Sequence, residues 1–167
     1  IPREAPFLAH PAESPLTHAA AETAAPQIRV IKRPDTPVPE AQLLSNGRYH
    51  VLVTAAGGGY SRWNDMAVTR WQEDPTRDHW GSFCYIRDTA TGTFWSNTAH
   101  PVPKRPDRYE AVFTEGRAEF HRQDRVDDSV IETRTEIVVS PEDDIELRRV
   151  RLINRSSERR TVEVTSY

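Results

Sequence analysis

The chain has 167 residues, enough for one domain of ordinary size and too few for two catalytic domains. Hydrophobic residues make up 37% of it and charged residues 28%, and four Trp, five Tyr and five Phe supply enough core material to exclude wholesale disorder. A formal charge of −3 without a local Lys/Arg cluster argues against nucleic acid as a partner.

The first 40 residues hold eight of the thirteen prolines, with no glycine and no sustained apolar period. Each proline removes a backbone donor and drives the preceding residue towards extended geometry, so residues 1–40 are predicted to form a semi-stiff, largely irregular Pro/Ala-rich linker. Only residues 27–32 have the composition of a short strand. The segment lacks the basic start and the apolar stretch of a signal peptide.

Residues 41–167 have a different character, because short runs of β-branched and aromatic residues alternate with turn sequences. This pattern predicts an all-β domain, an antiparallel β-sandwich. The strand pattern continues to the last residue, so we expect a fragment that is truncated at its C-terminus. The expected strands are 49–54 after the Asn46-Gly47 turn, 83–87 with 93–96, 108–113 with 116–122, 130–139 with 145–153, and 161–167.

Apolar residues in the 145–153 strand fall first at odd and then at even positions. Because side chains alternate between the two faces of a strand, this change of parity predicts a β-bulge near Arg148-Arg149 or burial on both faces. The paired arginines Arg148-Arg149 and Arg159-Arg160 are expected on solvated strand faces.

The stretch Thr54–Trp63 contains three consecutive glycines followed by Tyr, Ser, Arg and Trp. Glycines allow a positive φ or a close approach to another surface, which makes this stretch the best functional candidate. A phosphate loop is excluded because neither Gly-Lys-Ser/Thr nor the dinucleotide-binding spacing is present. The alternative is a turn or bulge between strands.

Residues 65–81 continue the candidate region with tryptophans, arginines and carboxylates. A sugar stacks its C–H faces on indole rings and exchanges hydrogen bonds with Arg and Asp, so this composition suits a carbohydrate. Each Trp taken alone fits a core position better than a ligand platform, and the Asp74/Asp78 pair fits a turn better than glycoside hydrolysis. The candidate substrate-binding residues are Gly57, Gly58, Gly59, Tyr60, Ser61, Arg62, Trp63, Arg70, Trp71, Asp74, Asp78 and Trp80.

Other chemistry has weak support in the sequence. The single cysteine, Cys84, excludes an intrachain disulfide and a multi-cysteine zinc site, and its strand-like context predicts an inert thiol. The histidines are scattered without ligand spacing, and no Gly-x-Ser-x-Gly elbow occurs. We therefore expect no metal, no cofactor and no catalytic residue. No apolar run reaches the roughly 18 to 20 residues of a membrane helix, so no membrane contact is expected from these residues.

Seven runs in order carry recognisable motifs: Leu43–Thr54, Gly57–Trp63, Thr69–Trp71, Asp74–Asp78, Trp80–Asp88, Phe94–Ser96 and Ser140–Arg149. Together they resemble cyclic β-1,2-glucan synthases over about residues 40–167. More distantly, Gly57–Ser61 and Phe94-Trp-Ser96 resemble the N-terminal sandwich domain of cellobiose and chitobiose phosphorylases, in glycoside hydrolase family 94.

The resemblance implies a β-supersandwich of the galactose-mutarotase-like type, normally longer than this chain and followed by an (α/α)6 barrel that carries the catalytic acid. Nothing in this sequence resembles that barrel. The implied parent acts on β-1,2-glucan by transglycosylation or phosphorolysis, as a cytoplasmic domain of a bacterial inner-membrane protein. The implied partners are a β-glucan oligosaccharide, the barrel and a second copy of the chain in a homodimer, with Gly57–Trp63 facing the catalytic cleft.

Two other functions are open at this stage. One is a purely structural or dimerisation domain, in which the aromatic residues are core and the glycine-rich loop is a docking element. The other is a stand-alone mutarotase-like epimerase, which needs a His acid and a Glu base converging in one concave sheet. Its candidate residues are His50, His79 and Glu110.

Overall fold

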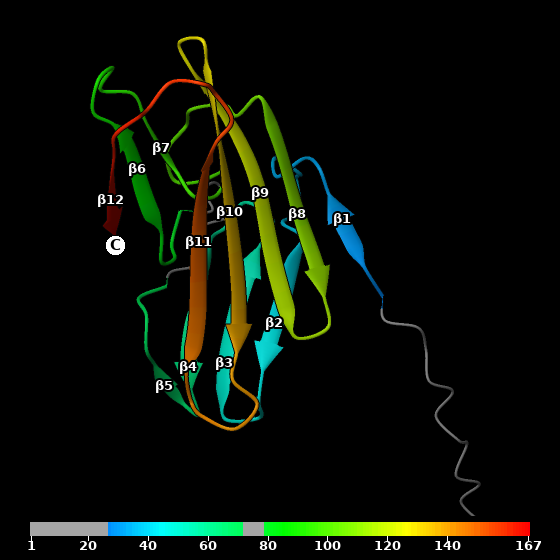
Figure 1. The fold of residues 1–167 in the computed structure, drawn as a ribbon. Coiled ribbons are helices and arrows are strands. Elements are labelled where there is room, and N and C mark those ends of the chain that lie inside the picture. Colours follow the sequence, from blue (N-terminus) through cyan, green and yellow to red (C-terminus); the bar gives the residue numbers. More distant parts are fainter. Residues whose placement is uncertain (1–26, 72–78) are drawn as a thin grey trace, which may run out of the picture.

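The computed structural model describes residues 27–71 and 79–167, and in these ranges the regular structure consists of strands without a helix (Figure 1). This confirms the all-β class predicted from the sequence. The linker prediction for residues 1–26 lies outside the described residues. The strands are β1 (Arg29–Ile31), β2 (Ala41–Ser45), β3 (Tyr49–Thr54), β4 (Gly59–Trp63), β5 (Met66–Ala67), β6 (Cys84–Asp88), β7 (Phe94–Ser96), β8 (Arg108–Thr114), β9 (Arg117–Val126), β10 (Ser129–Val139), β11 (Glu146–Asn154) and β12 (Val162–Ser166).

The strands form three antiparallel sheets. A five-stranded sheet has the order β1-β8-β9-β10-β11, a four-stranded sheet the order β2-β3-β4-β5, and a three-stranded sheet the order β12-β6-β7. The predicted hairpins β6–β7, β8–β9 and β10–β11 are confirmed, and β1 is the short strand expected within residues 27–32. The strands β2, β4 and β5 were not among those expected.

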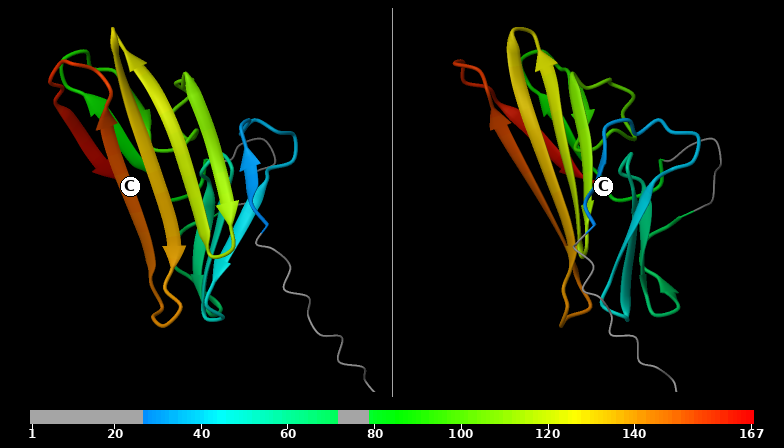
Figure 2. Two further views of the ribbon diagram at one scale, coloured as in Figure 1. Left: turned by 45° about the vertical axis from the view of Figure 1, so that its right-hand side comes forward. Right: turned by 90° about the vertical axis from the view of Figure 1, so that its right-hand side faces the viewer.

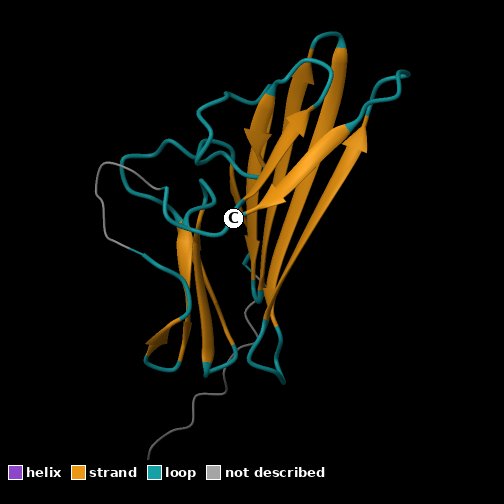
Figure 3. Ribbon diagram, turned by 90° about the vertical axis from the view of Figure 1, so that its left-hand side faces the viewer, coloured by secondary structure: helices purple, strands orange, loops and turns teal. Residues whose placement is uncertain are grey.

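Both smaller sheets pack on the same face of the five-stranded sheet, towards its opposite ends (Figures 2 and 3). On β9, Ala118, Phe120 and Val126 share one face because side chains alternate along a strand. The first two belong to the core under the four-stranded sheet, and Val126 belongs to the core under the three-stranded sheet. The long sheet therefore forms one layer, and the two short sheets form the other.

A buried arginine joins the two cores. Arg122 lies between them on β9 and is fully buried. It donates to both carboxylate oxygens of Asp124 at 2.6 and 2.9 Å, and to the backbone carbonyls of Thr98 at 2.5 Å and Lys104 at 2.7 Å. These bonds hold the irregular segment that follows β7 in place between the two small sheets. They also give hydrogen-bond partners to the Arg122 guanidinium, whose charge would otherwise be costly to bury.

The register between β10 and β11 is continuous from Ile131↔Asn154 to Val139↔Glu146, so the predicted bulge is wrong. Burial on both faces is also wrong, because Leu147 is 55% exposed. The inward positions at this end of β11 belong to Glu146 and Arg148, which find polar partners inside the sandwich. The parity of the apolar residues changes because polar residues take the inner face, while the backbone stays regular.

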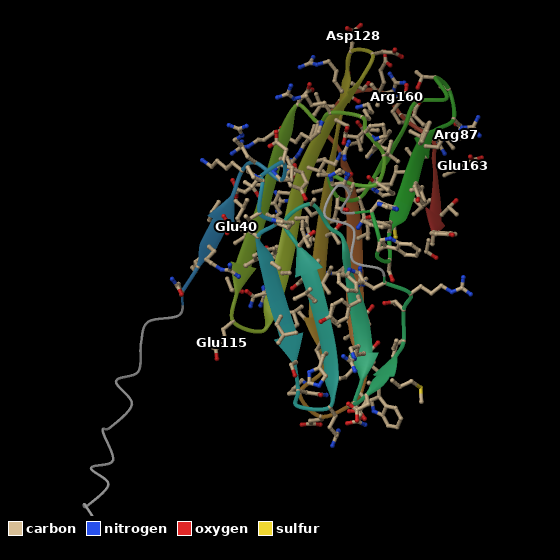
Figure 4. The ribbon with its side chains drawn as sticks, turned by 180° about the vertical axis from the view of Figure 1, so that it is seen from behind. Glu40, Arg87, Glu115, Asp128, Arg160 and Glu163 are labelled. Atoms are coloured by element: carbon tan, nitrogen blue, oxygen red, sulfur yellow. The ribbon has the colours of Figure 1, made fainter. Side chains whose placement is uncertain are left out.

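The expectation of solvated arginine pairs is wrong for one member of each. The Arg148 side chain is 21% exposed, whereas Arg149 is exposed. Arg160 is 11% exposed at its side chain and donates to Ser129 Oγ at 2.9 Å. It also lies 3.7 Å from the buried carboxylate of Asp88, and the loop after β11 is thereby held against the end of β6 (Figure 4).

Candidate functional site

The glycine-rich turn between β3 and β4 is buried. The Thr54 amide donates to the carbonyl of Gly58 at 2.8 Å, and the Gly59 amide donates to the carbonyl of Trp80 at 2.7 Å. Gly57 has a φ of +97°, and a Cβ added there would lie 2.1 Å from the Thr98 hydroxyl oxygen. The three glycines thus let the turn pack tightly against neighbouring segments, and their backbone is not presented to solvent.

Strand β4 divides the side chains of the candidate stretch between two faces. Ser61 and Trp63 share a face with Val51 of the neighbouring strand, which is in the core, whereas Tyr60 and Arg62 point to the outer face. On that outer face the rings of Tyr60 and Trp71 lie 5.4 Å apart, and Trp71 is 47% exposed. The sequence-predicted site is therefore two surfaces, one on each side of the four-stranded sheet.

On the inner face, Ser61 begins a chain of polar contacts to β11. Its hydroxyl donates to Glu146 Oε2 at 2.6 Å, and Arg148 donates to Glu146 Oε1 at 3.0 Å and to the carbonyl of Ser82 at 2.8 Å. Burial and the nearby Glu146 carboxylate raise the pKa of Tyr49, while Ser61 and Arg148 act in the opposite direction. Polar side chains therefore connect β4 to β11 across the inside of the sandwich.

At the end of this face, the last residue of β4 meets one residue from the β2–β3 turn and one from the β10–β11 turn. The Trp63 indole Nε1 donates to Asp144 Oδ2 at 2.7 Å, and Arg48 Nε donates to Asp144 Oδ1 at 2.8 Å. Both hydrogen bonds stabilise the carboxylate, so the pKa of Asp144 lies below its ordinary value. We call Arg48, Trp63 and Asp144 the Trp63 cluster. Trp63 is 41% exposed, so the cluster presents an indole ring beside a charged, ordered pair.

Asn46 holds the turns of the Trp63 cluster together. Its side-chain nitrogen donates to the carbonyls of Ser140 at 3.0 Å and Asp143 at 2.9 Å, while its oxygen accepts from the Arg48 and Tyr49 amides. The β2–β3 turn is thereby tied to the β10–β11 turn, at the lower end of the molecule in Figure 1. The cluster is built on hydrogen-bonded turns, which limits its freedom to rearrange.

The remaining predicted residues lie elsewhere. Arg70 is exposed after β5, and Trp80 is half-buried with its ring 5.7 Å from that of His79. Asp74 and Asp78 lie outside the described residues. Trp95, which was not a candidate, is fully buried and donates to Thr133 Oγ1 at 3.3 Å.

The sequence analysis missed Arg48, Asp144, Glu146 and Arg148 as site residues. Asn46-Gly47 was recognised only as a turn, and residues 140–144 only as the connection between two expected strands. A signal was present, because both turns carry charged residues next to strands that contribute to the core. What the linear pattern could not supply was the packing that brings the two turns to the same end of the sandwich.

The acid–base constellation of an epimerase is not formed. His50 lies on the outward face of β3, and Glu110 lies on the outward face of β8 in the opposite sheet layer. His50 Nδ1 is hydrogen-bonded to Ser45 Oγ at 2.7 Å, and His79 is exposed. Side chains on the two outer surfaces of a sandwich cannot converge on one substrate, so this alternative is rejected.

Within the described ranges, no group of three or more His, Cys, Asp or Glu side chains is placed to hold a metal ion. Residues 27–71 and 79–167 also contain no helix with the length and hydropathy needed to cross a bilayer. Cys84 is part-buried at the start of β6, and burial raises the pKa of its thiol although Arg148 acts against this. A raised pKa leaves less of the reactive thiolate at neutral pH.

Three antiparallel sheets packed in two layers define this part of the chain as a β-sandwich domain, with an aromatic and charged cluster at one end. Residues 24–167 match the family described as Glycosyl hydrolase 94, supersandwich domain, and the chain belongs to that family.

Similar proteins are much longer than this chain. The chain is 41% identical over 167 residues to the cyclic beta-(1,2)-glucan synthase NdvB of Rhizobium meliloti (strain 1021), which covers 99% of the chain and 6% of that protein. It is 30% identical over 147 residues to the N,N'-diacetylchitobiose phosphorylase of Vibrio furnissii, and 29% identical over 141 residues to that of Vibrio proteolyticus. Each of these two alignments covers 83% of the chain and 17% of the phosphorylase.

Proposed function

We propose that this supersandwich domain contacts a carbohydrate chain through the Trp63 cluster and serves an enzyme that processes β-glucan. The observation that carries the proposal is the half-exposed Trp63 ring, fixed by a 2.7 Å hydrogen bond to the charge-bearing Asp144. An exposed indole offers a face for the C–H surface of a pyranose ring. Arg48 and Asp144 beside it offer donors and acceptors for hydroxyl groups.

Preorganisation supports the same interpretation. Asp144 already accepts two hydrogen bonds, and Asn46 fixes the turn that carries Arg48. A sugar that arrives at this surface therefore meets side chains whose rotamers are set, which lowers the entropy lost on binding. The Tyr60–Trp71 pair on the outer face of the same sheet is a second aromatic surface from the predicted set.

The chemistry belongs to another part of the parent protein in this proposal. The described acid and base candidates of the epimerase hypothesis, His50 and Glu110, lie on opposite outer surfaces of the sandwich, and the similar proteins are a cyclic glucan synthase and disaccharide phosphorylases. The proposed parent transfers or phosphorolyses β-1,2-linked glucan with a barrel, to which this domain is attached. The cytoplasmic setting in a bacterial inner-membrane protein, and a possible homodimer, are parts of the same proposal.

A purely structural role is the second candidate, and one observation favours it. The Gly57–Gly59 turn is buried against Thr98 and the Trp80–Gly81 backbone, which suits packing more than ligand contact. Ile145 and Leu147 are 47% and 55% exposed beside the Trp63 cluster, and they offer apolar area to another protein surface.

Titration of the 167-residue chain with β-1,2-gluco-oligosaccharides, followed by NMR and calorimetry, separates the two functions. Saturable binding that shifts the Trp63 indole resonance, and that weakens at least about tenfold in Trp63→Ala, supports carbohydrate contact. Val30→Ala removes an exposed apolar side chain at the opposite edge of the five-stranded sheet and should change nothing. β-1,4 oligomers test the linkage. No binding of either sugar, together with a concentration-dependent dimer, would favour the structural role.

A further inference from the structure

The outer face of the three-stranded sheet carries a hollow of about 390 Å³. It lies on the side of β6 and β7 that faces away from the core, because Ile86 and Trp95 point inward from the same strands. The hollow is separate from the Trp63 cluster, which lies on the four-stranded sheet. Its lining residues are Tyr85, Arg87, Phe94, Glu163 and Thr165.

The strand register explains how this lining is assembled. Arg87 on β6 is directly opposite Phe94 on β7 and Glu163 on β12. In the next row, Tyr85 is opposite Thr165. One row therefore places an aromatic ring, a guanidinium and a carboxylate side by side across three strands, and the other row adds a phenol and a hydroxyl.

The charges of the hollow neutralise each other. Arg87 Nη1 donates to Glu163 Oε2 at 3.3 Å, and Figure 4 shows both side chains at the edge formed by β6 and β12. Both remain more than half exposed, so each keeps free donor or acceptor positions. A paired cation and anion favour a neutral ligand with many hydroxyl groups over a free anion, which Glu163 would repel.

The aromatic residues supply the apolar part of such a site. Phe94 is 54% exposed, so its ring is open to a ligand. Tyr85 is half-buried, and the ring of Tyr167 lies edge-on to it at 6.3 Å. Sugars are the neutral ligands that combine an apolar C–H face with a rim of hydroxyls, and this lining matches both parts.

We propose that this hollow is a second carbohydrate subsite, which takes one pyranose unit of a neutral oligosaccharide with Phe94 as the stacking surface. Arg87 and Glu163 exchange hydrogen bonds with vicinal hydroxyls, and Tyr85 closes one side. The subsite does not depend on the Trp63 cluster. If one long glucan reaches both sites, its second contact becomes intramolecular. The affinity of the glucan for the protein then rises without new contacts at either site.

The experiment is an NMR titration of the 167-residue chain with β-linked glucose disaccharides, following the backbone amides of residues 85, 87 and 165 separately from the Trp63 indole. We expect saturable shifts at these amides. Phe94→Ala should weaken the affinity obtained from these shifts at least about tenfold, and Phe94→Tyr should preserve the affinity because the ring remains. Phe94 is exposed, so neither variant should disturb the fold, which the buried indole of Trp95 reports.

The outcomes for the two sites are independent. In Trp63→Ala the hollow should still bind. In the unsubstituted chain, a Trp63 indole that does not respond while residues 85, 87 and 165 do would count against the proposed function and leave the subsite intact. No saturable shift at residues 85, 87 and 165, or shifts that Phe94→Ala leaves unchanged, would overturn the subsite. Saturable shifts with inorganic phosphate and silence with the disaccharides would also overturn it, because they would identify an anion site.

Discussion

The indole nitrogen of Trp63 donates a hydrogen bond of 2.7 Å to the carboxylate of Asp144, a residue 81 positions further along the chain. The bond joins the end of β4 to the β10–β11 turn, and Arg48 from the β2–β3 turn binds the other carboxylate oxygen. One side-chain contact thus links an exposed aromatic ring to a charge, and it gives that ring a fixed orientation at the end of the sandwich.

Acid titration should report this bond directly. Because Trp63 and Arg48 stabilise the charged form, the pKa of Asp144 lies below its ordinary value of about 3.8. The stability that this bond contributes is fully present above the ordinary pKa of about 3.8, and it is lost as the pH falls through the lowered pKa. The Trp63 indole resonance should shift with a midpoint below 3.8, whereas that of Trp95, bound to Thr133, should stay constant until the chain unfolds. An ordinary midpoint would show that the bond does not persist in solution.

Substitution of Gly57 should be far more costly than substitution of another glycine with positive φ. Gly57→Ala combines an unfavourable φ of +97° with a Cβ that overlaps the Thr98 side chain, so we expect a loss of about 2–4 kcal/mol in the free energy of unfolding. Gly92→Ala has a φ of +72° with nothing within 4 Å and should lose only about 1–2 kcal/mol. Urea denaturation measures both.

A second substitution tests the reason for that difference. Thr98→Gly removes the atoms that an alanine at position 57 would overlap. In the Thr98→Gly background, the further loss in the free energy of unfolding caused by Gly57→Ala should fall to the loss caused by Gly92→Ala. If the two substitutions are simply additive, the steric explanation fails.

The buried arginine that joins the two cores should be essential for stability. Arg122→Met leaves the fully buried Asp124 with Lys104 as its remaining ion-pair partner, and it removes the guanidinium donors to the carbonyls of Thr98 and Lys104. We expect a loss of about 3–5 kcal/mol in urea denaturation. Arg117→Met, on the opposite face of the same strand, removes only the ion pairs of a half-exposed arginine with Glu119 and Glu136 and should cost at most about 1 kcal/mol. Equal losses in the two variants would contradict the network.

Two adjacent arginines should behave differently. Arg160→Ala removes the donor to Ser129 and the cation nearest to the buried Asp88, and it should cost about 1.5–3 kcal/mol. Arg159 is exposed, so Arg159→Ala should change the free energy of unfolding by less than about 0.5 kcal/mol. Thermal unfolding of both variants measures the difference, and an equal response would show that Arg160 is solvated in solution.

Most of the strand pattern was predictable from the sequence because it depends on local properties. Alternating β-branched and aromatic residues between turn sequences located β3 and the hairpins β6–β7, β8–β9 and β10–β11. Strand β4 was missed because three glycines at its start are weak strand formers. Strand β4 pairs with β3, and the tight packing of those glycines supports this pairing. The strand propensities of single residues do not describe such packing.

The candidate site was predicted only in part. Tyr60, Ser61, Arg62 and Trp63 were identified as a unit, but a strand directs successive side chains to opposite faces, so the unit is divided between two surfaces. The partners Asp144 and Glu146 come from residues more than 80 positions away. Such contacts depend on the packing of two sheets, and a linear pattern does not contain that information.

The amino-acid sequence by itself determined the all-β class, the hairpin positions, the lack of a disulfide and the resemblance to glucan-processing enzymes, because each depends on residue types and their local order. The tertiary structure alone decided which polar residues become interior. Arg122, Arg148 and Arg160 resemble solvated strand residues in the sequence, yet each is placed opposite an acceptor on another element. A charged side chain is stable in a protein interior only when such partners are supplied, and they are supplied by the packing of the sheets.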